Sequence, residues 1–318
     1  MATDQRYVKL GQRIVPFPSD VLQVMDSCNH LLDDVGALHQ EMTDKGYLLI
    51  RGFHDRQEVL AAREAVLKYI DSLGGKLDSD HPFNDGVLKE GCGLGCLPVM
   101  EGRNEISHKD SVLRVLEGTR PFAFFKKYFN EDVKTFDYKW LRAMHHEGFT
   151  GAHVDNVYMS RGSKDLLTMW TPIGDVSIEM GVLAVCEGSN SLPSFSRMQS
   201  TYGEMDAELI GLKGTGWLTE DPFEITEKFG GQWKTTDFRA GDVLIFNMRT
   251  VHMSTTNTTQ YARLSCDTRW QPASHPCDPR FNGDFEKPKG KFGLLSKLDT
   301  ATIQSYTTIE GLKEKWGI

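Results

Sequence analysis

The spacing of apolar residues along the chain changes from a helical period to a strand period near its middle. Before that point, apolar residues recur at helical spacing and predict helices over residues 31–42, 55–70, 110–116 and 120–129. Lys45 and Gly46 form a basic end and a stop for the first of these helices, and Asp55 begins the second. A short apolar run at residues 47–50 predicts one buried strand between them. The first part of the chain, about residues 1–135, is therefore expected to be mainly helical.

After about residue 137, apolar and polar residues alternate in short runs. The runs are separated by clusters of Gly, Ser, Asn and Thr, and they predict strands at residues 138–146, 165–172, 180–186, 242–249 and 261–270. Several short strands in succession indicate an antiparallel sandwich or barrel. With a helical layer before it, the chain as a whole is expected to be α+β.

Two segments give no strong periodic signal and are expected to be long loops. The first, residues 72–106, contains GCGLGC at 91–96, which lacks the Lys-Ser/Thr ending and the following helix of a phosphate-binding loop. The second, residues 188–237, carries Trp217, Trp233 and several glycines. Loops of this length often cover an active site, so both are candidates for an enclosure.

Composition narrows the class of protein without choosing a function. The chain has 318 residues, 39% of them hydrophobic, a formal net charge of −8 and six cysteines. This charge disfavours a nucleic-acid or anionic-membrane partner, and no apolar run is long enough to span a bilayer. The cysteines are too few and scattered for a disulfide framework, and the pair Cys92 and Cys96 has no second pair to complete a zinc ribbon. We expect a reduced, cytoplasmic protein.

A histidine followed two residues later by a carboxylate can supply two ligands to one metal ion when both lie on a strand. The chain has four such pairs, which are His39/Glu41, His108/Asp110, His145/Glu147 and His153/Asp155. The first lies in a helical pattern, where the two side chains diverge, and Asp110 of the second fits better as a helix N-cap. The third ends a strand and has no evident partner. The fourth follows Gly151-Ala152 at the end of a predicted strand.

The segment at residues 238–270 favours the fourth pair. His252 follows a strongly apolar strand, so a jelly roll can bring it to His153 and Asp155 at the barrel mouth. Two histidines and one carboxylate form the facial triad of non-heme Fe(II) oxygenases, which leaves coordination positions open, whereas a structural zinc site needs a fourth ligand. Arg263 offers a fork for a distal carboxylate and Ser254 a hydroxyl for the same group.

The alternation after His252 predicts a polar inner face on the last strand. Arg263, Ser265, Asp267 and Arg269 share one face of it. Such a face suits a pocket for anionic ligands. The alternative for Asp267 and the arginines is a structural ion pair.

At this point the sequence resembles the phytanoyl-CoA dioxygenase family of Fe(II)/2-oxoglutarate oxygenases. The matching segments are MTDKGYLLIRGF (42–53), AHVDN (152–156), KDLLTMWTPIGDVSIEMGVLAVCEGSN (164–190), GDVLIFNMRTVHMSTTN (241–257) and YARLSCDTRW (261–270). The resemblance implies a double-stranded β-helix, a cupin-like jelly roll backed by N-terminal helices. We therefore expect one domain over 1–318, with a helical part at about 1–135, a jelly-roll core at about 136–275 and an extension at 276–318.

The resemblance also assigns roles to particular residues. It places Fe(II) on His153, Asp155 and His252, and 2-oxoglutarate on Arg263 and Ser254, with Trp170 and, more weakly, Thr168 beside the co-substrate. The chain departs from the family with Val154 in place of the common Gln, and with Glu187-Gly-Ser-Asn190 in place of Pro-Gly-Ser-His. Because Asp155 is present, halogenation is disfavoured.

The expected activity is hydroxylation of a C–H bond in a small-molecule metabolite, with O₂ consumed and succinate and CO₂ released. Two alternatives stay open, which are a metal-dependent jelly-roll hydrolase or isomerase and a non-catalytic family member that binds 2-oxoglutarate. Arg161, Lys164, His145 and His146 are candidate contacts for an anionic substrate, but solvated loop charge or a satisfied polar strand end is the favoured explanation of each. No basic groove for CoA phosphates is evident, and the sequence names neither the substrate nor an oligomeric state.

Overall fold

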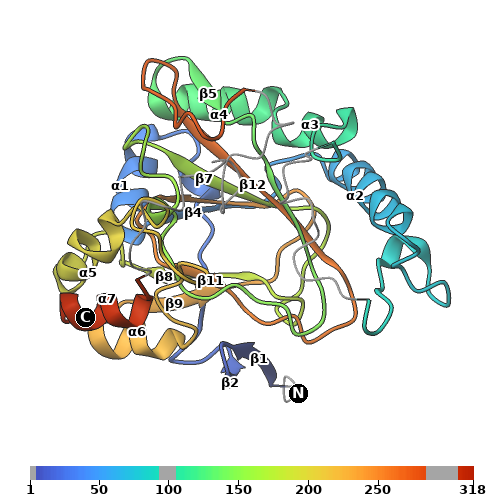
Figure 1. Cartoon of the computed structure of the whole chain (residues 1–318). Coiled ribbons are helices and arrows are strands. Elements are labelled where there is room, and N and C mark those ends of the chain that lie inside the picture. Colours follow the sequence, from blue (N-terminus) through green and yellow to red (C-terminus); the bar gives the residue numbers. More distant parts are fainter. Residues whose placement is uncertain (1–4, 93–104, 284–306) are drawn as a thin grey trace.

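Two mainly antiparallel sheets face each other and enclose one interior (Figure 1). The computed structural model describes residues 5–92, 105–283 and 307–318. Apolar residues from both sheets, among them Phe246 and Val185 on their inner faces, pack in one cluster, as in a jelly roll. The N-terminal helices cover the outside of the larger sheet, so the expected α+β jelly roll backed by helices is confirmed.

The larger sheet carries most of the predicted strands. Its order is β4-β10-β7-β12-β5 with β6 also paired to β12, and its strands are β4 (Tyr47–Ile50), β5 (Val133–Thr135), β6 (Trp140–Met144), β7 (Leu167–Pro172), β10 (Val243–Asn247) and β12 (Arg263–Pro272). All of its pairings are antiparallel. Both faces of β12 are buried along its whole length, because helices cover one face and the barrel interior lies on the other.

The smaller sheet closes the other side of the barrel. Its order is β11-β8-β9-β3, and its strands are β3 (Gln23–Val24), β8 (Leu183–Glu187), β9 (Gln232–Thr235) and β11 (His252–Ser254). Only the β3–β9 pairing is parallel. A separate hairpin of β1 (Arg6–Leu10) and β2 (Arg13–Phe17) adds Val8, Leu10, Val15 and Phe17 to the interior cluster.

The N-terminal helices pack on the outer face of the larger sheet, as predicted. They are α1 (Val35–Lys45), α2 (Arg56–Ser72), α3 (Asp110–Leu116) and α4 (Thr119–Phe129). Helices α1 and α4 cover Leu167, Met169 and Ile245, and α2 and α3 cover Leu264 and Cys266. The strand residues between these, such as Thr168 and Ser265, therefore face the barrel interior.

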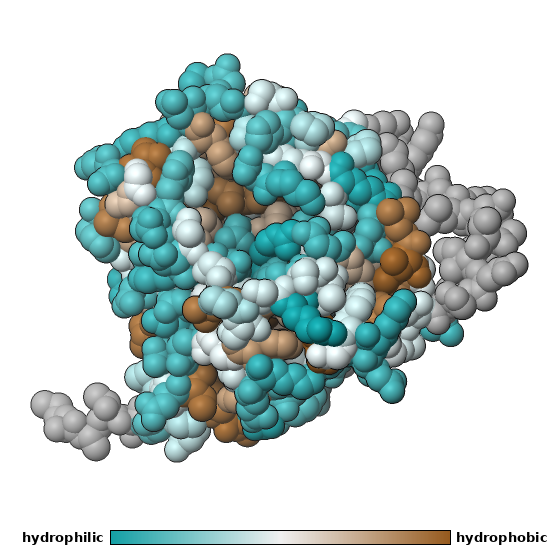
Figure 2. Space-filling model, turned by 90° about the vertical axis from the view of Figure 1, so that its left-hand side faces the viewer, coloured by the Kyte–Doolittle hydropathy of each residue, from teal (hydrophilic) through white to brown (hydrophobic). Residues whose placement is uncertain are grey.

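Helices α5 (Ser196–Ser200), α6 (Pro222–Phe229) and α7 (Ile309–Trp316) lie together beside the smaller sheet (Figure 1). Among the described helices, none combines the length and the apolar character that crossing a bilayer requires. Polar residues cover most of the face in Figure 2, and its apolar residues gather in small groups.

The structure corrects the expectation for the second long loop. Residues 188–237 contain α5, α6 and strand β9, whose Trp233 and Thr235 are buried at period two. The strand signal is weak because β9 has four residues and directly follows Gly230 and Gly231, both at positive φ. The described part of the first loop is also packed, since Leu88 and Gly86 hydrogen-bond to Gln260 and Ala262 before β12. Most of the GCGLGC segment lies outside the described residues.

Three smaller expectations also need correction. The first part of the chain is not only helical, because the β1–β2 hairpin precedes the helices. Its alternating buried residues around Gly11, at positive φ, were a usable strand signal. The first helix begins at Val35, with Asp34 as its N-cap, and residues 29–31 form a 3-10 turn instead. Lys109, not Asp110, is the N-cap of α3.

A buried cluster of charges joins the chain after β12 to the loop after Asp155. Arg280 contacts Asp278 at 2.5 Å and Glu208 at 2.9 Å, and it donates to the backbone oxygen of Tyr158 at 2.7 Å. Arg161 reaches the same Glu208 at 3.2 Å. Residues 278–280, which begin the expected C-terminal extension, are thus fastened directly beside the candidate site.

Asp242 fixes the turn that leads into β10. Its buried carboxylate accepts hydrogen bonds from the backbone N–H groups of Gly52 at 2.9 Å and Arg239 at 2.8 Å, and it pairs with Arg51 at 2.6 Å. This one side chain therefore joins the end of β4 to the start of β10.

We predict that Asp242→Ala lowers the free energy of unfolding by about 3 kcal/mol, because two backbone donors and a half-buried arginine lose their acceptor. Chemical denaturation followed by circular dichroism measures the change. Asp20→Ala is the matched control, since Asp20 is exposed and its loss should change stability by less than about 0.5 kcal/mol. Equal stabilities for the two variants would contradict this role of Asp242.

Candidate metal centre

His153 and His252 come from distant parts of the sequence and are joined through their backbones. The N–H of His153 donates to the oxygen of His252 at 3.0 Å, and the N–H of His252 donates back to the oxygen of His153 at 2.9 Å. Residues paired in this way in antiparallel strands present their side chains on the same face. The two imidazole rings accordingly lie side by side, with their centroids 4.2 Å apart.

Backbone carbonyls fix the protonation of both rings. The Nδ1 of His153 lies 2.8 Å from the oxygen of Gly151, and the Nδ1 of His252 lies 3.0 Å from the oxygen of Thr250. Since a carbonyl only accepts, each Nδ1 carries a proton, and each ring turns its Nε2 toward the centre. Burial, together with the neighbouring His153, lowers the pKa of His252 to about 3, so this ring is neutral at physiological pH.

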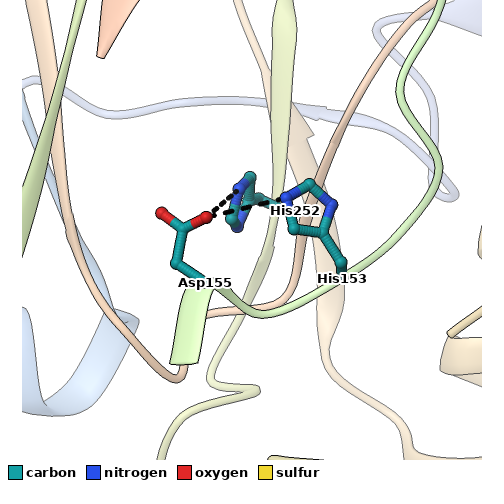
Figure 3. Close-up of side chains that lie close together, drawn as sticks. All are labelled: His153, Asp155 and His252. Atoms are coloured by element: carbon teal, nitrogen blue, oxygen red, sulfur yellow. Dashed lines mark ion pairs between the residues drawn. The ribbon is translucent and has the colours of Figure 1, made fainter. Parts of the chain in front are cut away.

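The carboxylate of Asp155 faces the Nε2 atoms of both histidines. It begins the 3-10 turn Asp155–Val157, and its Oδ1 lies 3.7 Å from the Nε2 of each histidine. Figure 3 shows both rings directed at this one oxygen, while the other carboxylate oxygen points away. Burial alone would raise the pKa of Asp155, but the charge of Arg269 and the two histidines hold that pKa well below its usual range. The carboxylate is therefore ionised.

The three groups fit a divalent transition metal. Their ligand atoms lie within 4.8 Å of one another, and all three residues are buried. A metal ion about 2.1 Å from each ligand atom holds neighbouring ligand atoms about 3 Å apart, so small side-chain movements suffice. No further His, Cys, Asp or Glu joins this group among residues 5–92, 105–283 and 307–318. Two imidazoles and one carboxylate leave open positions and match the facial-triad pattern.

The other predicted site residues also face the barrel interior. Arg263 is buried on β12, where its Nη1 contacts the Ser265 hydroxyl. Ser254 is buried on β11 and accepts a hydrogen bond from the N–H of Thr150 at 2.7 Å. Trp170 lies on the inner face of β7, with its ring centroid 4.8 Å from that of Phe238 in an edge-to-face contact.

Thr168 shares the inner face of β7 with Trp170, but its hydroxyl donates to Asp155 Oδ2 at 2.7 Å. The structure thus places Thr168 on the carboxylate of the triad. Its expected place beside the co-substrate stays a prediction.

Sequence reasoning gave Arg269 no role at the metal site. Its Nη2 lies 3.2 Å from Asp155 Oδ2, whereas Asp267 pairs with Arg142 at 3.2 Å. The ion pair considered between Asp267 and Arg269 is therefore wrong, because each of these residues pairs with a different partner. The alternation of the sequence already placed Arg269 on the same inner face of β12 as Arg263. The structure adds that Arg269 stands opposite Thr168 in the sheet.

The structure separates the remaining histidine pairs from this centre. His39 Nε2 lies 2.9 Å from the backbone oxygen of Tyr128, and His108 Nε2 lies 3.0 Å from that of Asp137. His145 is half-buried and contacts the backbone oxygen of His146, and exposed His146 contacts that of Thr259.

The two basic candidates for a substrate contact are paired with acidic residues. Arg161 is neutralised by Asp206 at 2.6 Å and Glu208 at 3.2 Å. Exposed Lys164 lies 3.8 Å from Glu204. Arg161 is thus part of the scaffold, and Lys164 is a surface charge.

Part of the segment 188–237 packs against the two residues that precede His153. Ala152 exchanges backbone hydrogen bonds with Leu218 and Thr219, both at 2.8 Å. Trp217 lies so close to Gly151 that a Cβ there would come within 2.6 Å of its ring. Only glycine allows this approach, which places the indole two residues from a candidate ligand.

Comparisons with known proteins agree on one family. A model of the phytanoyl-CoA dioxygenase family matches residues 42–265 of this chain. The chain is 25% identical over 276 residues to a 1-deoxypentalenic acid 11-beta-hydroxylase of Streptomyces exfoliatus, covering 80% of this chain and 88% of that protein. The protein of the same name from Streptomyces arenae is 24% identical over 271 residues, again covering 80% and 88%.

Solved structures show the same fold at lower sequence identity. The epimerase SnoN, in complex with Fe³⁺, alpha ketoglutarate and nogalamycin RO, has a TM-score of 0.51 and 19% identity, covering 78% of this chain and 87% of that one. The alpha ketoglutarate dependent carbocyclase SnoK has a TM-score of 0.51 and 17% identity, covering 76% and 85%. Both structures therefore support the jelly-roll architecture described above.

Proposed function

The chain belongs to the phytanoyl-CoA dioxygenase family, and we propose that it hydroxylates a C–H bond of a small-molecule metabolite with iron held by His153, Asp155 and His252. It is a non-heme Fe(II)/2-oxoglutarate-dependent oxygenase that uses O₂ and releases succinate and CO₂. The observation that carries the proposal is the convergence of two imidazole nitrogens and one ionised carboxylate in a buried site with open positions.

When bound, iron and 2-oxoglutarate supply an oxidant strong enough for an unactivated C–H bond. The protein's part is to hold the reactants and to exclude water from a reactive site. The backbone bridge between His153 and His252 gives two of the ligands a fixed separation. Hydrogen bonds from each Nδ1 to a carbonyl fix the ring orientation, which raises ligand basicity.

We assign the distal carboxylate of 2-oxoglutarate to Arg263 and Ser254. Arg263 presents a buried guanidinium on β12, and Ser254 follows His252 on β11, so a ligand between the two sheets can reach both. The Ser254 Oγ already accepts from Thr150, which leaves its own proton for donation to a carboxylate. Trp170 supplies an apolar wall on the same inner face.

Residues 212–221 provide one side of the enclosure. Their contacts with Ala152 and Gly151 place Trp217 over the strand that leads to His153. This packing supports the view that the segment 188–237 restricts the access of water to the site.

The proposed substrate class rests on the relatives. The Streptomyces exfoliatus relative acts on 1-deoxypentalenic acid, a carboxylic acid. We therefore propose a small anionic metabolite in preference to a CoA thioester, which would need a basic groove for its phosphates.

The first prediction concerns turnover. Purified protein with Fe(II), 2-oxoglutarate and O₂ should release succinate, and release should rise when the right small acid is present. A panel of cyclic terpenoid acids, amino acids, phosphonates and acyl-CoA thioesters, read out as succinate and oxidised product, measures this. Stimulation by acyl-CoA thioesters alone would contradict the proposed substrate class, and hydrolysis or isomerisation without succinate would contradict the oxygenase.

The second prediction separates co-substrate binding from metal binding. Arg263→Gln should raise the KM for 2-oxoglutarate by at least about tenfold, because a charge-assisted fork is replaced by a neutral amide. Steady-state succinate release against 2-oxoglutarate concentration measures KM and kcat. Arg114→Gln, on the outer helix α3, is the control and should behave as wild type. An unchanged KM in Arg263→Gln would refute the assigned role.

A further inference from the structure

We propose that Arg269, together with Thr168, is a positioning residue that keeps Asp155 bound to the metal through one oxygen only. The coordination position that a second oxygen would occupy is then left for 2-oxoglutarate or O₂. This inference rests on the proposed function and adds to it the way in which the chain holds its carboxylate ligand.

The two oxygens of Asp155 have different surroundings. Oδ1 faces the Nε2 atoms of His153 and His252, at 3.7 Å from each. Oδ2 accepts a hydrogen bond from the Thr168 hydroxyl at 2.7 Å and lies 3.2 Å from Arg269 Nη2. Figure 3 shows one of these oxygens facing the two histidine rings and the other pointing away from them. Protein donors thus hold the second oxygen, and the first is directed at the metal position.

The sheet places both donors at the same spot. Arg269 on β12 and Thr168 on β7 are direct cross-strand partners, so their side chains lie on the same face. Arg269 is 1% exposed, its Nε lies 3.0 Å from the sulfur of Met159, and its guanidinium lies over the Trp140 ring at 4.7 Å. These contacts restrain the guanidinium, and they explain why the arginine can hold the carboxylate in one orientation.

The contacts of Arg269 also argue against a role in the scaffold alone. Its Nη1 is buried and has no hydrogen-bond partner among the described residues. A buried arginine that serves only to join parts of the fold has its donors satisfied, as Arg280 does with Asp278, Glu208 and a backbone oxygen. The only charged group that Arg269 contacts in the described part of the chain is the candidate ligand.

The count of coordination positions gives the consequence. A carboxylate can bind a metal through one oxygen or through two. Two histidines and a one-oxygen carboxylate leave three of six octahedral positions, enough for a two-point keto-acid chelate and O₂. A carboxylate bound through both oxygens takes one of these three positions. Loss of Arg269 should therefore weaken the binding of 2-oxoglutarate more than the binding of metal. The positive charge of Arg269 does not attract a metal cation, so its removal takes away no attraction for the metal itself.

The test compares two affinities in one protein under anaerobic conditions. Full-length wild type and the variants Arg269→Met, Arg269→Lys and Thr168→Val are titrated first with Co(II), by its visible absorption, and then with 2-oxoglutarate on the cobalt-loaded protein. Arg142→Met is the matched control, since it removes another inner-face arginine that pairs with Asp267 and not with Asp155.

We expect Arg269→Met to bind Co(II) nearly as tightly as wild type and 2-oxoglutarate at least about tenfold more weakly. Arg269→Lys should recover part of this loss, Thr168→Val should show a smaller one, and Arg142→Met none. Wild-type affinity for 2-oxoglutarate in Arg269→Met would overturn the proposal. So would an equal loss of cobalt and 2-oxoglutarate, or the same loss in Arg142→Met.

Two further outcomes are distinguishable. If Arg269→Met does not fold, Thr168→Val decides, because it changes a hydroxyl to a methyl of similar size and must still weaken 2-oxoglutarate for the proposal to stand. If cobalt-loaded wild type does not bind 2-oxoglutarate, the proposed function itself fails. If wild type binds it and every variant binds it equally well, only the role of Arg269 and Thr168 fails.

Discussion

The pair of backbone hydrogen bonds between His153 and His252 is the constraint on which the site depends. These bonds join two residues far apart in the sequence, at 2.9 and 3.0 Å, and set their side chains on one face. Neighbouring segments hold both residues in place. Strand β11, which contains His252, pairs with β8, and residues 218–219 hydrogen-bond to Ala152. A shift by one residue in either partner would turn its imidazole away from the site. The register of the two sheets therefore determines whether a metal centre exists.

Burial of charge is the second constraint, and it explains the arrangement around the triad. An ionised carboxylate inside a barrel is unfavourable unless it is paired. Asp155 meets this requirement with Arg269 and Thr168 on one oxygen, and a bound metal would meet it on the other. Asp267 meets it with Arg142. The inner face of β12 is polar for the same reason, since its outer face packs on the helices and only its inner face can hold groups that bind anions.

Much of the site could be predicted from the sequence because its residues stand at fixed offsets on strands. Ser254 after His252 and the alternation along β12 follow from a period of two, whereas Asp155 begins a 3-10 turn and not the strand that the spacing of His153 and Asp155 assumed. Arg269 lies on the predicted inner face, but its partner could not be predicted, because the Arg269–Thr168 pairing depends on the register of β7 against β12.

The same distinction applies to the fold. Helices α1 to α4 and the long strands have enough residues to show their period. Strand β9 and the β1–β2 hairpin are short and interrupted by glycine or proline, and packing against the barrel determines them. The contact of Trp217 with Gly151 likewise joins residues far apart in the sequence, so no local sequence pattern predicts it.

The central claim is that this barrel assembles one site for iron and 2-oxoglutarate together. Its most direct test is the visible absorption of the protein under anaerobic conditions, with Fe(II) and 2-oxoglutarate added separately and then together. The account predicts a weak charge-transfer band only when both are present, lost in His252→Ala and Asp155→Ala and retained in His108→Ala. Metal binding by the wild-type protein without such a band would contradict it.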